Sequence, residues 1–259
     1  MADPGLEGAV VLVTGGVRGV GAGIARSFLA HGARVVTCAR RQPDEPVSEA
    51  GREAEFRSCD VRDPEQAAHL VDAVVERHGR LDVVVNNAGG APFAEAAEAS
   101  PRFHAKVVDL NLVSALHVSQ RANSHMQRAD GGAIVMVSSV AGTRGSPGTA
   151  AYGAAKAGLD NLAASLAIEW APKVRVNALQ VGMVRTESAD LHYGGADSVA
   201  GVGGTVPLGR LAEPREVGEC AAFLASPQAS YVSGASLLVH GGGEVPAFLA
   251  ASNANKGDA

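Results

Sequence analysis

Short apolar runs rich in valine, isoleucine and leucine alternate with longer helical patterns along almost the whole chain. Seven runs are predicted to be strands: residues 9–13, 34–37, 55–58, 81–85, 133–137, 174–179 and 237–239. Five longer segments between them have the length and periodicity of helices: residues 20–31, 64–78, 103–127, 151–170 and 214–225. This alternation predicts βαβ units with right-handed crossovers, and hence a parallel sheet that is covered on both faces.

The predicted fold class is therefore α/β, a doubly wound Rossmann domain with a seven-stranded parallel sheet and helices on both faces. No linker and no repeat divides the chain, so residues 1–259 are expected to form a single domain. The least regular stretch, residues 185–210, follows the sixth strand and is expected to be the substrate loop, the alternative being a plain surface loop. The tail, residues 250–259, is expected to be poorly ordered.

Composition excludes several other classes of protein. The 259 residues carry a formal net charge of −5, which gives no reason to bind the phosphates of a nucleic acid. No stretch approaches the roughly 20 apolar residues of a membrane span, and the N-terminus lacks the basic region of a signal peptide. The three cysteines lack metal-site spacing, so we expect a cytoplasmic protein with reduced thiols, no metal and no membrane partner.

A glycine-rich loop joins the first predicted strand to the first predicted helix. The glycines are spaced G-x-x-x-G-x-G, which allows a tight turn and brings backbone N–H groups close to a bound diphosphate at the positive end of the helix. The alternative is a tight turn without a ligand. The candidate cofactor-binding residues of this loop are Gly15, Arg18, Gly19, Val20 and Gly21.

The end of the second predicted strand indicates which dinucleotide the loop would take. An Asp or Glu about 20 positions beyond the glycines holds the ribose 2′-hydroxyl of NAD, whereas an arginine accommodates the 2′-phosphate of NADP. Here Arg40 and Arg41 follow the strand, and no acidic residue lies between the strand and Asp44. Arg18 can approach from the glycine loop. This favours NADP(H) over NAD(H), unless the two arginines are merely solvated.

A tyrosine and a lysine occupy the spacing Tyr-x-x-x-Lys at the start of a predicted helix. Tyr152 and Lys156 therefore share one helix face, and the ammonium group is expected to lower the pKa of the phenol toward the range of a general acid or base. Such a pair alone could be a coincidence of helical spacing. The strand just upstream, however, delivers two hydroxyls, Ser138 and Ser139, to the carboxyl edge of the sheet.

Together these motifs resemble the short-chain dehydrogenase/reductase family, NADP(H) type, and in particular members like 3-oxoacyl reductases. The resemblance covers nearly the whole chain. Besides the glycine loop and the active-site residues, residues 86–89 (Asn-Asn-Ala-Gly) match the family's fourth-strand motif, and the stretch from Ser233-Gly234 to Gly241-Gly242 matches its C-terminal segment. Two positions depart from the pattern: Val181 stands where the family often has proline, and His240 where it commonly has aspartate.

The resemblance implies roles for individual residues. Tyr152 would exchange a proton with the substrate oxygen, Ser139 would hydrogen-bond that oxygen, Lys156 would bind the nicotinamide ribose, and Asn111 would hold a proton-relay water. Ser138 is not expected to take the role of Ser139. The cofactor contacts implied in addition to the glycine loop and Arg40 are Asp60, Val61, Asn87, Ala88, Gly89, Tyr152, Lys156, Val184 and Thr186.

The implied activity is NADP(H)-dependent interconversion of a ketone and a secondary alcohol, with a small-molecule carbonyl or alcohol as substrate and, by family habit, a homotetramer. Epimerisation or dehydration on the same fold, or a non-catalytic NADP(H)-binding regulatory protein, are the alternatives. The sequence does not distinguish an acyl thioester, a steroid, a sugar or a xenobiotic ketone as substrate, nor the physiological direction.

Overall fold

Seven parallel strands form the central sheet of the protein. The computed structural model describes residues 5–189 and 193–251. Across the sheet the strands lie in the order β5-β2-β1-β6-β7-β8-β9. Their bounds are β1 Val10–Thr14, β2 Arg34–Ala39, β5 Glu55–Ser58, β6 Val83–Asn86, β7 Gly132–Ser139, β8 Val174–Val181 and β9 Ser236–Val239. Each neighbouring pair is parallel, which confirms the predicted sheet.

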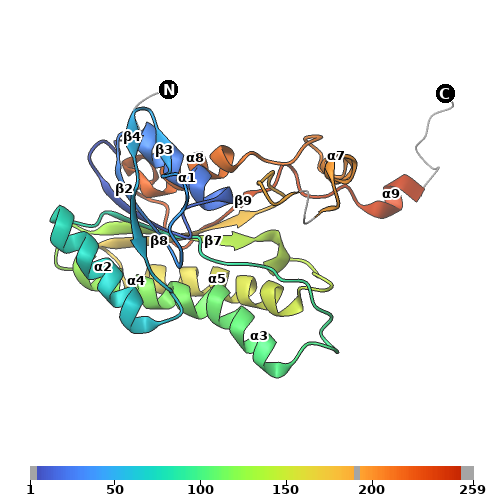
Figure 1. Cartoon of the computed structure of the whole chain (residues 1–259), viewed down its shortest axis with the longest axis horizontal. Coiled ribbons are helices and arrows are strands. Elements are labelled where there is room, and N and C mark those ends of the chain that lie inside the picture. Colours follow the sequence, from blue (N-terminus) through green and yellow to red (C-terminus); the bar gives the residue numbers. More distant parts are fainter. Residues whose placement is uncertain (1–4, 190–192, 252–259) are drawn as a thin grey trace.

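Helices cover both faces of this sheet (Figure 1). One layer holds α1 (Gly19–Ala30) and α8 (Pro214–Ala225), which pack against each other. The opposite layer holds α2 (Pro64–His78), α4 (Ser114–Met126) and α5 (Ala150–Glu169). The doubly wound α/β fold predicted from the alternating pattern is therefore confirmed.

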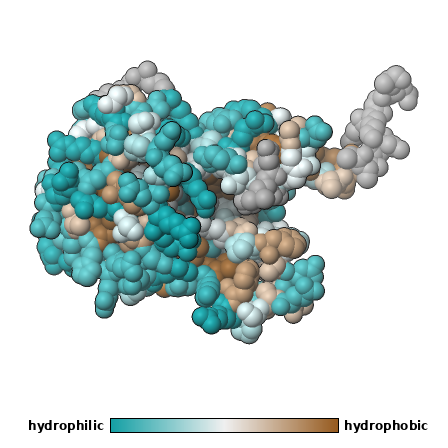
Figure 2. Space-filling view, in the orientation of Figure 1, coloured by the Kyte–Doolittle hydropathy of each residue, from teal (hydrophilic) through white to brown (hydrophobic). Residues whose placement is uncertain are grey.

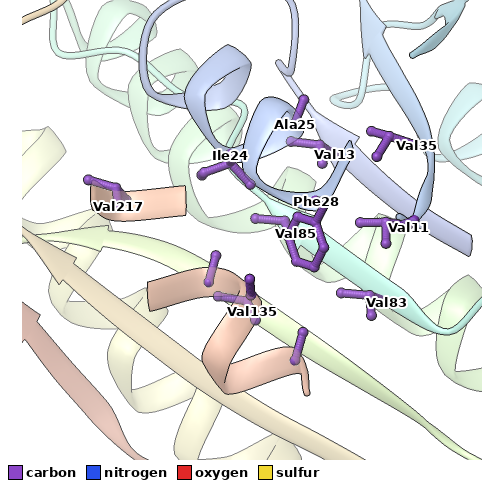
Figure 3. Close-up of a cluster of buried hydrophobic side chains, with 14 of the residues drawn as sticks. Val11, Val13, Ile24, Ala25, Phe28, Val35, Val83, Val85, Val135 and Val217 are labelled. Atoms are coloured by element: carbon purple, nitrogen blue, oxygen red, sulfur yellow. The ribbon is translucent and has the colours of Figure 1, made fainter. Parts of the chain in front are cut away.

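The strands supply both layers with apolar side chains because successive residues point to opposite faces. On β1, Val11 and Val13 join the cluster under α1 and α8, whereas Val10 and Leu12 join the cluster under the other helices. Figure 3 shows the first cluster, where Phe28 of α1 lies among the valines of the sheet. Hydrophilic residues dominate the outer surface of this part of the molecule (Figure 2).

The predicted helix over residues 103–127 is interrupted. It consists of α3 (Pro101–Val108), a π-helical turn over Asp109–Val113, and α4. The amide of Asn111, in the turn, donates to the Val107 carbonyl at 2.9 Å, and the hydroxyl of Ser114, the first residue of α4, donates to the Leu110 carbonyl at 2.7 Å. These side chains compete with the main chain for its carbonyls, which accounts for the local change of helix type.

Smaller elements lie outside the predicted pattern. A two-stranded hairpin joins β3 (Ser48–Glu49) to β4 (Arg52–Glu53), and its short polar strands carry no apolar signal. Helix α7 (Ala196–Gly204) lies in the stretch predicted to be irregular. Helix α9 (Ala247–Ala251) includes the first two residues of the tail expected to be poorly ordered, and the rest of that tail, residues 252–259, lies outside the described residues.

The order of the strands places a crevice at one edge of the sheet. From β1 the chain proceeds outward to β2 and β5 on one side, then returns to β6 and proceeds outward in the other direction. The loops that follow β1 and β6 therefore diverge, and ligands of open α/β sheets bind at such a switch point, beyond the carboxyl ends of the strands. No helix in the described ranges has both the length and the apolar character needed to cross a bilayer.

Candidate active site

The loop after β1 requires glycine at several positions, because of its backbone conformation and its close contacts. Gly15 and Gly19 have φ angles of +61° and +52°, a region that side chains other than glycine rarely adopt. A Cβ atom at Gly21 would lie 2.2 Å from the Gly15 carbonyl oxygen and 2.4 Å from the Asn87 amide nitrogen. The loop is therefore held in a shape that leaves its backbone exposed to a ligand.

Residues at the ends of β1 and β6 hold this loop in place. The hydroxyl of Thr14 accepts hydrogen bonds from the backbone N–H groups of Asn87 and Ala88, both at 3.0 Å. The side-chain amide of Asn87 donates to the carbonyls of Thr14 and Gly15 at 3.0 and 3.1 Å. Asn87 was predicted from its motif. The bracing role of Thr14 was not, although a buried hydroxyl at the end of a strand could have indicated it.

A cavity of about 350 Å³, which we call the cofactor cavity, extends from the glycine loop across the ends of β2 and β5. It brings together most of the predicted cofactor-binding residues, namely Gly15, Arg18, Gly19, Val20, Gly21, Arg40, Asp60, Val61, Asn87, Ala88, Gly89 and Thr186. Arg41 is exposed, and it is not one of the described residues that line this cavity.

Three guanidinium groups line the cofactor cavity. They belong to Arg18, Arg40 and Arg62, the last of which was not predicted. Arg62 donates from Nε to Oδ1 of Asp60 at 2.9 Å. This hydrogen bond, together with a smaller contribution from the charge of Arg40, lowers the pKa of the Asp60 carboxyl. Asp60 is therefore paired with Arg62, while Arg18 and Arg40 provide positive charge on the wall.

A carboxylate of the protein already contacts the glycine loop. Glu187 accepts from the backbone N–H of Gly19, with its two oxygens at 3.0 and 3.3 Å from the nitrogen. The loop therefore presents an N–H group that binds an anion, at the start of a helix that has no acidic residue in its first turn. The loop has a glycine that leaves no room for a Cβ, and a backbone N–H that binds the carboxylate of Glu187. Both features fit a loop that binds the diphosphate of a dinucleotide cofactor.

A second cavity, of about 290 Å³, adjoins the first and contains the four predicted catalytic residues, Asn111, Ser139, Tyr152 and Lys156. We call it the catalytic cavity. Val20, Asn87, Gly89 and Thr186 line both cavities, so the two form one continuous cleft. Val184, the remaining predicted cofactor contact, lines the catalytic cavity. Ser139 reaches it from the end of β7, and Tyr152 and Lys156 from the first turns of α5.

The electrostatics of the tyrosine and the lysine differ from the expectation. Burial raises the pKa of the Tyr152 phenol, and its hydrogen bond with Ser139 offsets part of that increase. Burial also lowers the pKa of Lys156 to about 8, which the charge of Asp160 partly opposes. The expected lowering of the tyrosine pKa by Lys156 is thus absent from this structure, because desolvation dominates at both groups.

The lysine is held from two sides. Its Nζ donates to the Val137 carbonyl at 2.7 Å and lies 5.6 Å from the centre of the Tyr152 ring. One helical turn later, Asp160 accepts from the Gln180 amide at 2.8 Å. Asp160 was not predicted, although its spacing of four residues from Lys156 is a usable signal. The hydroxyl of Ser138, the residue before Ser139, donates to the Lys156 carbonyl at 3.1 Å.

Asn111 connects the π-helical turn to the loop that follows β6. Its Oδ1 accepts from the Gly90 N–H at 3.0 Å, and its Nδ2 donates to the Gly90 carbonyl at 2.9 Å. The side chain is 1% exposed. Asn111 therefore fixes the backbone that follows the Asn-Asn-Ala-Gly motif at the edge of the catalytic cavity.

The two departures from the family pattern lie at the ends of neighbouring strands, where Val181 pairs with Val239, the residue before His240. A Cβ atom at Gly182, the residue after Val181, would be 2.8 Å from the Cβ of His240. The close approach of these two segments accounts for glycine at position 182. Tyr193, which belongs to the predicted substrate loop (residues 185–210), lines the catalytic cavity.

Comparison with known proteins agrees with this geometry. The family model described as enoyl-(acyl carrier protein) reductase matches residues 15–244. A cis-4-hydroxycyclohexanecarboxylate dehydrogenase from Sinomonas cyclohexanicum is 40% identical over 240 residues, which cover 90% of this chain and 95% of that protein. The oxidoreductase UcpA of Escherichia coli K12 is 36% identical over 256 residues, covering 93% and 96%.

A solved structure shares the fold. The ligand-free aldohexose dehydrogenase of Thermoplasma acidophilum superposes with a TM-score of 0.85 at 30% identity, covering 92% of this chain and 94% of the other. Shared fold, long matches and a complete motif set lead to one conclusion. The chain belongs to the short-chain dehydrogenase/reductase family and is an oxidoreductase of the class that acts on CH–OH groups with a nicotinamide cofactor.

Proposed function

We propose that the protein is an NADP(H)-dependent oxidoreductase that interconverts a ketone and a secondary alcohol, with Tyr152 as general acid and base. One observation carries this proposal. Tyr152 and Ser139 line the same cavity, which is continuous with the cofactor cavity. A substrate oxygen can therefore meet both hydroxyls beside the cofactor.

The residues of the catalytic cavity have different roles in the proposed reaction. In reduction, Tyr152 donates its proton to the carbonyl oxygen, and in oxidation it accepts the proton of the alcohol. Ser139 donates a hydrogen bond to the same oxygen and orients it. Lys156 would hold the ribose hydroxyls of the cofactor, and Asn111 would hold the water that returns protons to solvent. The nicotinamide cofactor, when bound, supplies or accepts the hydride.

The preference for NADP(H) is supported by charge at the end of β2. Arg40 follows that strand, where an NAD-binding protein would place a carboxylate, and it lines the cofactor cavity with Arg18. Asp60, a carboxylate that lines the same cavity, is paired with Arg62. The cavity thus offers guanidinium groups to a 2′-phosphate.

A cyclic secondary alcohol is the substrate class that the comparisons favour. The relative from Sinomonas cyclohexanicum is named for oxidation of a hydroxycyclohexane ring that bears a carboxylate. We therefore propose cis-4-hydroxycyclohexanecarboxylate and the corresponding ketone, 4-oxocyclohexanecarboxylate, as the first compounds to assay.

We also propose a homotetramer. Apolar side chains are exposed on three elements of the fold: Ile168 on α5, Phe223 on α8 and Leu238 on β9, which are 82%, 41% and 51% exposed. Burying them between copies would remove this surface from water. Light scattering at micromolar concentration should give the tetramer mass, and a monomer mass would contradict the proposal.

The test of the catalytic proposal is turnover by the wild type and by Tyr152→Phe. The wild type should reduce 4-oxocyclohexanecarboxylate with stoichiometric loss of NADPH absorbance, and Tyr152→Phe should lower kcat by about 10² to 10⁴-fold. Tyr231→Phe is the matched control, because Tyr231 is fully exposed. Near-wild-type turnover by Tyr152→Phe would overturn the mechanism.

The same assay separates the alternatives. An epimerase or dehydratase would convert substrate without net consumption of NADPH. A regulatory protein would bind NADPH without turning over any carbonyl compound. Consumption of NADPH with an enoyl thioester, but with no ketone, would instead favour the reaction in the description of the matching family model.

A further inference from the structure

A third cavity adjoins the catalytic cavity. It measures about 370 Å³ and shares Gly182 with the catalytic cavity. We call it the outer cavity. Much of its wall is apolar, formed by Val140, Met183, Val206 and Leu238. A ring or short chain attached to the reacting carbon would therefore find an apolar enclosure here.

One ion pair lines this apolar enclosure. Nη2 of Arg144 lies 2.5 Å from Oε1 of Glu244, and the two side chains are 45% and 38% exposed. The other terminal nitrogen of Arg144 donates to the Gly145 carbonyl at 3.2 Å. A half-exposed pair of this kind contributes little to stability, so its partners can be exchanged at small cost.

The backbone holds Arg144 close to the catalytic residues. Ser139 ends β7, a short 3₁₀ turn follows, and the Arg144 N–H donates to the Val140 carbonyl at 3.2 Å. Burial raises the pKa of the Tyr193 phenol, the charge of Arg144 lowers it, and the charge of Glu244 raises it. Both charged groups therefore act on a side chain that lines the catalytic cavity beside Tyr152.

The charges around the substrate are unbalanced in favour of an anion. Among the described residues that line the catalytic cavity, Lys156 is a cation and none is an aspartate or glutamate. The outer cavity adds Arg144 and one carboxylate, Glu244, which is already paired with it. An anionic group in the outer cavity can therefore pair with Arg144, whereas a cationic group would have to compete with Arg144 for Glu244.

We propose that Arg144 binds a carboxylate of the substrate in place of Glu244, so that the enzyme acts on hydroxy and keto acids whose acid group lies across the apolar enclosure from the reacting carbon. This rests on the proposed function, since it names the substrate class of the same site. The planar guanidinium matches a carboxylate with two parallel hydrogen bonds. Glu244 then acts as a counterion that the substrate displaces.

Binding to the NADPH complex tests the proposal without catalysis. Cyclohexanecarboxylate, which has no reacting oxygen, and its neutral amide, cyclohexanecarboxamide, are titrated by calorimetry into the enzyme saturated with NADPH. The acid should bind about tenfold or more tightly than the amide, because hydrogen bonds to charged groups are the stronger ones. Arg144→Gln should remove this preference, and Arg144→Lys should restore part of it.

Glu244→Gln is the variant with the opposite expected sign. It removes the competing carboxylate and should tighten binding of the acid several-fold while leaving the amide unchanged. Equal binding of acid and amide by the wild type, or an acid preference that survives Arg144→Gln, would overturn the proposal. Unchanged NADPH affinity and melting temperature in the variants exclude a folding defect as the cause.

Kinetics keep this inference separate from the proposed function. Reduction of 4-oxocyclohexanecarboxylate and of its neutral methyl ester is compared at equal NADPH. Arg144→Gln should raise KM about tenfold for the acid and leave KM for the ester within twofold. Turnover of both compounds that depends on Tyr152 but not on Arg144 would uphold the proposed function and reject the role of Arg144.

Discussion

The two ends of the cleft are built in different ways. At the cofactor end, backbone atoms of strand ends and glycines form the wall, and Thr14 and Asn87 lock them together through four hydrogen bonds. At the substrate end, side chains from strand ends, from α5 and from loops form the wall, and α7 packs through a small cluster of Ala189, Val199 and Leu211. The cofactor end is therefore specified by shape, and the substrate end by exchangeable side chains.

This difference has a functional consequence. A dinucleotide is a constant ligand and can be met by a fixed backbone, whereas a substrate pocket must be adjustable by substitution. The contrast predicts that small changes at the cofactor end are severe, and that larger changes at the substrate end alter specificity while the fold persists.

Gly21→Ala should have the largest effect. The added methyl would meet the Gly15 carbonyl oxygen at 2.2 Å, so the backbone of the loop must move. We expect a loss of about 3 kcal/mol in the free energy of unfolding and a fall in NADPH affinity of about 100-fold. Urea unfolding and nicotinamide fluorescence measure the two quantities. Wild-type affinity in this variant would show that the glycine loop is not rigid.

Lys156→Met should separate activity from stability. Burial lowers the pKa of Lys156 from 10.5 to about 8, and one pKa unit corresponds to about 1.4 kcal/mol. Holding the charged lysine therefore costs the folded protein about 3 kcal/mol at neutral pH. The variant should lose most activity, by about 100-fold, because its thioether cannot hold the ribose, and yet unfold at higher urea concentration at pH 7.

The sign of the pH dependence follows from the direction of this pKa shift. The folded protein binds the lysine proton less tightly than the unfolded chain does, so the cost is full below pH 8 and vanishes as the pH rises to 10.5. The stability advantage of Lys156→Met should accordingly shrink between these two pH values. An advantage that grows with pH would contradict this assignment.

Glu187→Gln should have a moderate effect where the two ends meet. In the structure Glu187 occupies the N–H of Gly19, which a cofactor phosphate would take, so its negative charge opposes binding. Replacing the carboxylate by a neutral amide should tighten NADPH binding by about threefold to tenfold, as expected for loss of one exposed like charge. Weaker binding would mean that Glu187 assists the cofactor.

Gly201→Ala should have the smallest effect. Gly201 lies within α7, and a Cβ atom there would meet nothing within 4 Å. Alanine should raise the free energy of unfolding by about 0.5 to 1 kcal/mol by favouring the helix. Differential scanning calorimetry measures this change. Destabilisation on the scale of Gly21→Ala would remove the contrast between the two ends.

The same contrast explains how far the sequence could predict the structure. The sheet, its helices and the cofactor end follow from patterns that lie close together in the chain, such as valine runs ending in glycine loops. The π-helical turn was missed because Asn111 and Ser114 act through hydrogen bonds to carbonyls, which periodicity does not reveal.

For the substrate end, the sequence predicts where the pocket lies but not the contacts between its side chains. Its charged pair joins Arg144 and Glu244, residues 100 positions apart, and no local pattern relates them. The contact of Glu187 with Gly19 spans 168 positions in the same way. The direction of the Tyr152 pKa was also predicted wrongly, because spacing shows a neighbouring charge but not the degree of burial.

The most direct test of the account is a parallel titration of the purified protein with NADPH and NADH, repeated with Arg40→Asp and with Arg41→Asp as the matched control. The wild type should bind NADPH at least about tenfold more tightly. Arg40→Asp should abolish or invert that preference, whereas Arg41→Asp, which alters an exposed residue outside the cofactor cavity, should largely keep it. Equal or tighter binding of NADH by the wild type, or a preference unaffected by Arg40→Asp, would contradict the account.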